Sequence, residues 1–95
     1  MAAYLIGHIT VKDPDLWQEY IAGVKKSLIP FEANVVFRGP RVGVLAGEHS
    51  YEQCVVIQFA DQNSLQKWYN SDTYQSLIPT RNKAADVVII SYDHS

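Results

Sequence analysis

The sequence has 95 residues, of which 47% are hydrophobic, and a formal net charge of -2. This length fits one domain with a modest core, so we expect a single domain over residues 1–95. Lys and Arg gather nowhere along the chain, which argues against nucleic acid as a main partner. No apolar run approaches the ~20 residues that cross a membrane, so a membrane partner is not expected either.

The N-terminal stretch and the cysteine content indicate a cytoplasmic protein. Residues 1–11 lack a basic segment and pass directly into alternating sequence, unlike a signal peptide. Cys54 is the only cysteine, which excludes an intramolecular disulfide and argues against a cysteine-based metal site. Neither metal-ligand spacing nor a phosphate-binding loop occurs in the sequence, so we expect no metal and no cofactor.

The first elements expected along the chain are a strand and a helix. Residues 4–11 are rich in β-forming side chains and predict the first strand. Asp13 followed by Pro14 is typical of a helix start, because Asp can cap free N–H groups and Pro suits the first turn. Pro30 ends this helix. Between these points one apolar stripe recurs at helical spacing, made of Trp17, Tyr20, Ile21, Val24 and Leu28.

The middle of the sequence predicts two further strands. Two apolar runs in residues 34–46 are separated by Gly39 and Pro40, and such a pair inside a β region points to a bulge or an edge strand. Residues 47–50 have the composition of a turn, and residues 53–60 that of the third strand.

Two helices in direct succession are predicted next. Asp61 can cap the first helix, and Ser71 can cap the second. Pro79 removes a backbone donor, so we expect the second helix to kink or end near there and to place Arg81 at its exit. Residues 86–92 then predict the last strand.

The resulting order βαββαβ predicts an α+β, ferredoxin-like fold, with two helical segments on one face of a four-stranded antiparallel sheet. Strand alternation assigns Val55, Ile57 and Phe59 to the helix side. The opposite face is also largely apolar and no helix remains to cover it, so we expect a homodimer whose two sheets enclose a shared interior. Side chains assigned to that opposite face are Tyr4, Ile6, His8, Thr10, Cys54, Val56 and Gln58.

Three titratable or charged side chains are candidates for a site. His8 could shuttle a proton near neutral pH, or be a hydrogen-bonded structural histidine. Arg38 could bind a carboxylate or enolate of a ligand, or form a salt bridge at a bulged strand. Arg81 could line the pocket, or pair with Asp72 or Asp86.

The aromatic residues of the helical pair are expected to build core and pocket wall together, because helical spacing usually indicates packing. A tyrosine hydroxyl that faced a cavity would be a natural donor to a ligand carbonyl. These aromatic candidates are Trp68, Tyr69 and Tyr74. We therefore predict one cavity, approached by His8, Arg38 and Gln58 and walled by Trp68, Tyr69 or Tyr92.

Several short motifs occur together along the chain. They are Asp13-Pro14, Arg38-Gly39, Trp68-Tyr69-Asn70-Ser71 with Tyr74, and Pro79-x-Arg81. In this combination the chain resembles an uncharacterised bacterial family, domain of unknown function thirteen-thirty (DUF1330), over nearly its whole length. The resemblance implies a dimeric α/β barrel, in the same broad group as antibiotic-biosynthesis-type monooxygenases, muconolactone isomerases and the ligand-sensing domains of some transcription regulators.

The resemblance supplies no reaction. The chain also departs from the family pattern at two positions, because the family favours an acidic residue where this chain has Gln58 and a Pro where it has Ala60. If an acid at the first position served as a general base, Gln58 could not replace it.

Two kinds of function stay open at this point. One is a cofactor-independent enzyme that performs proton transfer or oxygenation on a small carbonyl-bearing or aromatic metabolite, for which His8 is the catalytic candidate. The alternative is a ligand-binding or structural homodimer without catalysis. A bound haem would need an axial ligand that faces the cavity.

Overall fold

The computed structural model describes residues 1–94, and the predicted order βαββαβ is confirmed. The first half contains β1 (Ala3–Val11), α1 (Pro14–Leu28), a short 3-10 helix η1 (Ile29–Phe31) and β2 (Asn34–Pro40). The second half contains β3 (Gln53–Phe59), α2 (Gln62–Tyr69), α3 (Asp72–Gln75), α4 (Ile78–Ala84) and β4 (Ala85–Asp93). No helix among residues 1–94 is long and apolar enough to cross a membrane.

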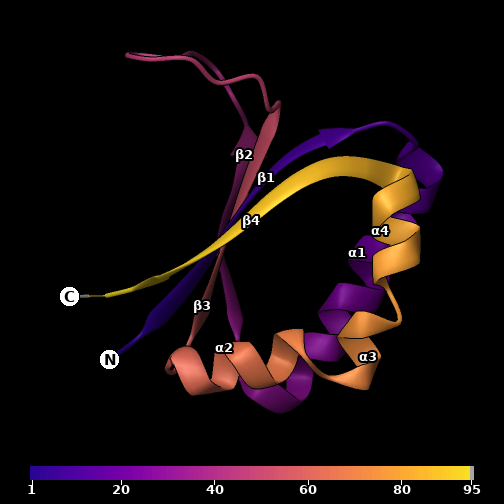
Figure 1. The fold of residues 1–95 in the computed structure, drawn as a ribbon, viewed down its shortest axis with the longest axis vertical. Coiled ribbons are helices and arrows are strands. Elements are labelled where there is room, and N and C mark those ends of the chain that lie inside the picture. Colours follow the sequence, from indigo (N-terminus) through magenta and orange to yellow (C-terminus); the bar gives the residue numbers. More distant parts are fainter. Residues whose placement is uncertain (95) are drawn as a thin grey trace.

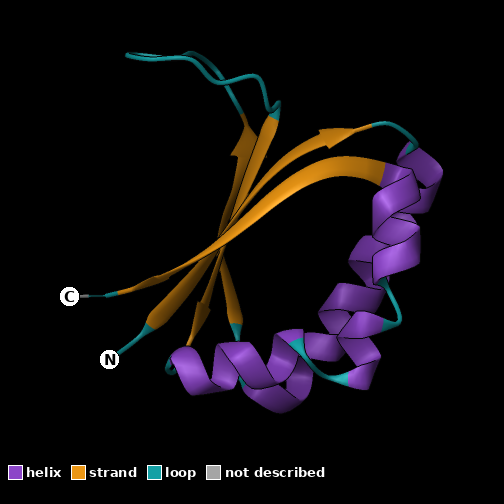
Figure 2. Cartoon of the chain, in the orientation of Figure 1, coloured by secondary structure: helices purple, strands orange, loops and turns teal. Residues whose placement is uncertain are grey.

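The strands form one four-stranded sheet in the order β2-β3-β1-β4, and every neighbouring pair is antiparallel. The helices lie against one face of this sheet, and the other face carries no helix within residues 1–94 (Figure 1, Figure 2). We call these the covered face and the open face. The sheet ends at the edge strands β2 and β4, so the single chain does not close into a barrel.

The local signals at the helix starts act as expected. The Asp13 carboxylate accepts hydrogen bonds from the backbone N–H groups of Asp15 at 3.1 Å and Leu16 at 3.2 Å. Asp61 caps α2 through the N–H of Ser64 at 2.8 Å. These side chains satisfy donors that the first helical turn leaves free.

The helical stretch is interrupted near Pro79, as expected, but the prediction that Arg81 lies at a helix exit is wrong. The second predicted helix is two helices: α3 is capped by Ser71 and ends at Gln75, and α4 then begins at Ile78 with Pro79 in its first turn. A first-turn residue needs no intrahelical N–H bond, so proline starts this helix instead of breaking it. Arg81 therefore lies inside α4 and not at a helix exit.

The core lies between the covered face and the helices. Its largest fully buried side chains are Phe59 from the sheet and Trp68 and Tyr74 from the helices. Helix α1 packs closely on the segment before α4, because a Cβ added at Gly23 would come within 2.6 Å of the Leu77 side chain. The absence of a side chain at this position permits the close approach.

The β2–β3 connection differs from the regular sheet around it. Strand β2 is an edge strand with a bulge between Val35 and Phe37, as the Gly-Pro signal suggested, although the irregularity falls earlier than that pair. The second apolar run is not a strand: residues 41–52 have no regular structure and project from the end of the sheet (Figure 1). We call residues 41–52 the arm. Its side chains Val42 and Leu45 are fully exposed, at 99% and 103%.

Candidate functional site

A cavity of about 230 Å³ lies between the covered face and the helices. Its walls are mainly apolar. The sheet contributes side chains that include Leu5, Ile9, Val55, Ile57, Val87 and Ile89, and the helices contribute Trp17, Tyr20, Ile21, Val24, Trp68 and Tyr74. The more polar lining residues are Gln18, Arg38 and Gln53.

A hydrogen-bonded network of two tyrosines and an arginine forms one part of this wall. The hydroxyls of Tyr20 from α1 and Tyr74 from α3 lie 2.8 Å apart. Arg81 from α4 donates from Nη1 to the Tyr74 hydroxyl at 3.0 Å and makes a longer contact of 3.5 Å with the Tyr69 hydroxyl. Tyr69 and Arg81 lie behind Tyr74 and do not line the cavity themselves. Side chains from four helices, α1, α2, α3 and α4, thus meet at one polar point.

The protonation states of this network follow from its surroundings. Burial, with the adjacent Tyr74 hydroxyl, raises the pKa of Tyr20 far above its ordinary value. For Arg81, burial acts to lower the pKa, but the hydrogen bonds to Tyr69 and Tyr74 outweigh it and the pKa is raised. Tyr20 therefore stays neutral and Arg81 stays charged near neutral pH.

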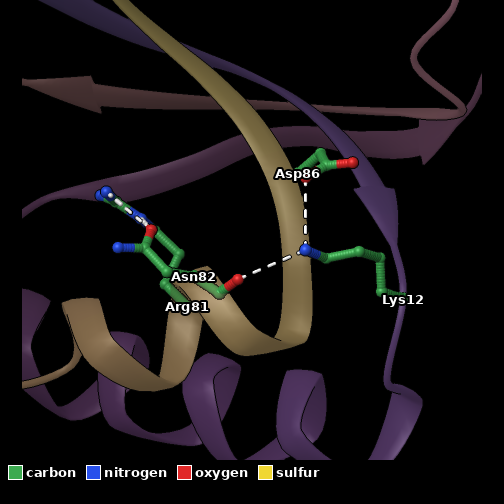
Figure 3. A network of polar contacts seen from close by, with 4 residues as sticks. All are labelled: Lys12, Arg81, Asn82 and Asp86. Carbon is green, nitrogen blue, oxygen red and sulfur yellow. Dashed lines mark hydrogen bonds and ion pairs between the residues drawn. The ribbon is translucent and has the colours of Figure 1, made fainter.

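The ion pairs considered for Arg81 from the sequence do not form. Asp86 pairs instead with Lys12 at 3.3 Å, and the Lys12 ammonium also reaches the Asn82 carbonyl at 3.5 Å (Figure 3). The Arg81 guanidinium lies against the Asn82 side-chain oxygen at 3.4 Å, on the other side of α4 from Lys12 (Figure 3). Because α4 continues through residue 81, the Arg81 side chain is directed toward Tyr69 and Tyr74.

A second buried hydrogen-bond chain fixes the Trp68 ring in the cavity wall. The indole Nε1 donates to the Ser27 hydroxyl at 2.9 Å, and that hydroxyl donates to the Val24 carbonyl at 2.7 Å. The indole donor and the hydroxyl therefore both have partners, as buried polar groups require. Trp68 also contacts Tyr74, with ring centroids 4.3 Å apart.

The prediction of one cavity shared by His8, Arg38 and Gln58 is wrong. Residues opposite each other in antiparallel strands share a face, and Arg38 is paired with Val55 on the covered face. His8 and Gln58 are on the open face. The bulge before Phe37 explains the separation, because one extra residue in β2 moves Arg38 to the other side of the sheet.

The open face brings together a different set of predicted residues. One cross-strand row on this face contains Tyr4, Gln58 and Tyr92. His8 is on the same face of β1, two residues beyond Ile6. The His8 ring is 4.9 Å from the ring of His49 in the arm, and its Nδ1 is buried without a hydrogen-bond partner in the described residues. Within residues 1–94 no group of three or more His, Cys, Asp or Glu side chains is placed to hold a metal ion.

Sequence reasoning missed Tyr20 as a site residue. Tyr20 belongs to the apolar stripe of α1 and was assigned to the core, where it is indeed buried. Its hydroxyl was the available signal, because a buried tyrosine usually needs a hydrogen-bond partner. The sequence could not identify that partner, since Tyr74 is 54 residues away.

The fold and cavity define a ferredoxin-like α+β domain with an open antiparallel sheet. The chain belongs to the family described as Domain of unknown function (DUF1330), whose model matches residues 2–93. The resemblance noted in the sequence is thereby confirmed. A search of curated proteins found no match.

Solved structures with the same fold include proteins with and without a described activity. A protein of unknown function from Rhodopseudomonas palustris superposes with a TM-score of 0.81 at 12% identity, covering 99% of this chain and 82% of that one. A dimeric ferredoxin-like protein of unknown function from Thermobifida fusca gives 0.67 at 19% identity, covering 99% and 92%. SnoaB, a cofactor-independent oxygenase from Streptomyces nogalater, gives 0.68 at 9% identity, covering 99% and 93%. Similarity at these identities establishes the fold alone.

Proposed function

We propose that this protein is a homodimer that binds a small apolar molecule in the cavity of each chain. The carrying observation is the cavity itself, which combines apolar walls with a polar point made of Tyr20, Tyr74 and Arg81. An apolar cavity of ~150 Å³ accepts benzene, so about 230 Å³ can hold one substituted ring. Mostly apolar walls with a few placed polar groups are typical of ligand sites.

The open face supports the homodimer. Phe37, Val88, Ile90 and Tyr92 expose between 37% and 52% of their surface there, although a sheet face of this composition belongs in a core. A second copy presents the same apolar face, so packing two sheets together would cover both by one symmetric contact. The structurally similar protein from Thermobifida fusca is described as dimeric.

Binding without catalysis is supported better than proton transfer. A general base must lie within hydrogen-bond reach of the proton it removes. The cavity wall carries no carboxylate or imidazole among the described residues, and His8 is on the opposite face of the sheet. Of the predicted ligand-binding residues, Arg38, Trp68 and Tyr74 line this cavity and belong to the proposed site, with Tyr69 and Arg81 behind them. Gln58 and Tyr92 belong to the proposed dimer contact.

The test is to fill the cavity and follow a fluorinated probe by ¹⁹F NMR. Ile21→Trp adds an indole at a lining position, whereas Ala22→Trp adds the same group at an exposed position on the same helix. We expect 4-fluoro-isopropylbenzene to bind the wild type and Ala22→Trp but not Ile21→Trp. Absent binding to the wild type, or equal binding to both variants, would contradict the proposal.

A further inference from the structure

In the network at the cavity wall, one hydroxyl proton has no acceptor among the described residues. The two tyrosine hydroxyls carry two protons, and the contact between Tyr20 and Tyr74 uses one of them. Arg81 can only donate, so its contact with Tyr74 uses an acceptor position and no hydroxyl proton. Among the described residues no carbonyl or carboxylate accepts the remaining O–H, and a buried donor without an acceptor is costly.

The direction of the network follows from the position of Arg81. Because the guanidinium donates to the Tyr74 oxygen, it polarises that hydroxyl and makes it the better donor of the pair. Tyr74 then donates to Tyr20, so the Tyr74 hydroxyl accepts one bond and donates one, whereas the Tyr20 hydroxyl only accepts. The proton left over is that of Tyr20, a residue that lines the cavity.

The positive charge of Arg81, behind this network, has no carboxylate partner within residues 1–94. Arg81 is half-buried, and its contacts in the described residues are with Tyr69, Tyr74 and the Asn82 oxygen. The nearby carboxylate of Asp86 is paired with Lys12 instead. The positive charge of Arg81 is therefore not cancelled by an ion pair, and it favours negative charge at the end of the tyrosine chain.

We propose that the cavity selects ligands in which an apolar body of about one ring carries an accepting oxygen, either a carbonyl or an oxyanion. The Tyr20 hydroxyl donates to that oxygen, while Tyr74 and Arg81 are positioning residues that orient and polarise this donor. This inference rests on the proposed binding function and adds the class of ligand. A ligand whose polar end is itself only a donor would leave the Tyr20 proton unmatched and is disfavoured.

Two probes of nearly equal shape separate this inference from binding alone. 4-Fluoroacetophenone has a carbonyl oxygen and no donor, and 4-fluoro-isopropylbenzene replaces that oxygen by a methyl group. The quantity to measure by ¹⁹F NMR is the ratio of their dissociation constants, compared between the wild type and Tyr20→Phe. We expect the preference for the ketone to fall about tenfold in Tyr20→Phe and less in Arg81→Met. It should not change in Tyr92→Phe, which removes a hydroxyl from the open face.

An infrared measurement on the wild type makes the test independent of variant folding. The carbonyl stretch of bound 4-fluoroacetophenone should lie below its frequency in a hydrocarbon solvent, as a hydrogen bond requires. A hydrocarbon-like frequency, or an affinity ratio unchanged by Tyr20→Phe, would overturn the inference while leaving the binding function intact. Failure of both probes to bind would instead overturn the proposed function.

Discussion

The two faces of the sheet are built by the same four strands, but their polar groups are in different states. On the covered face, the buried indole of Trp68 has Ser27 as its partner, and the Tyr74 hydroxyl has both Tyr20 and Arg81. On the open face, the buried Nδ1 of His8 has no partner within residues 1–94, and the apolar side chains of Val88 and Ile90 are exposed. The covered face is already packed against its helices, whereas the open face has the composition of a core but no helix in residues 1–94 covers it.

The largest effect that this comparison predicts is the loss of the Trp68 ring. Trp68→Ala removes a side chain of 2% exposure from the covered face and should lower the free energy of unfolding by about 3–5 kcal/mol. Lys67→Ala, at an exposed neighbouring position on α2, should change it by no more than about 0.5 kcal/mol. Chemical denaturation measures both values. Similar costs for the two variants would show that the covered face is not the main core.

The next effect concerns assembly through the open face. Ile90→Asp places one charge from each chain in the proposed sheet-to-sheet contact, where burial of unpaired charge is unfavourable. We expect the dissociation constant of the dimer to rise at least about a hundredfold. Analytical ultracentrifugation at micromolar concentration should show a dimer for the wild type and a monomer for this variant.

The matched control for assembly is Ala22→Asp, which places the same charge on the exposed side of α1. This variant should remain dimeric. A wild type that sediments as a stable monomer would contradict the homodimer and, with it, the view of the open face as half of an interior.

The fold was predictable because its determinants are local. The Asp13-Pro14 start and the strict alternation of β3 each depend on neighbouring residues, so the order of elements and the two faces could be inferred before any contact was known. Alternation in β1 also continues through Gly7 without a bulge, which placed His8 correctly on the face opposite the helices.

The candidate site was less predictable because it depends on long-range contacts and on one extra residue. The sequence indicated that a bulge was close to Arg38 but not on which side, and that choice decides the face of Arg38. Arg81 was expected to find a carboxylate, but a proline that begins α4 turned it toward Tyr74. Neither outcome is determined by spacing along the chain.

The smallest effect predicted is a pH dependence that arises at the start of α2, the helix that carries Trp68 onto the covered face. The backbone N–H of Ser64 donates to the Asp61 carboxylate and holds its pKa below its ordinary value. A carboxyl with a depressed folded-state pKa stabilises the fold above its unfolded pKa of about 3.9, and this contribution is lost as the pH falls through the folded-state pKa.

Asp61→Asn keeps an accepting oxygen for the cap but cannot titrate. We therefore expect the melting temperature of the wild type to exceed that of Asp61→Asn slightly at pH 7, and the difference to vanish in acid. Because Asp61 is exposed to solvent, salt should weaken this difference. A difference that grew in acid would mean that the cap does not favour the charged carboxylate.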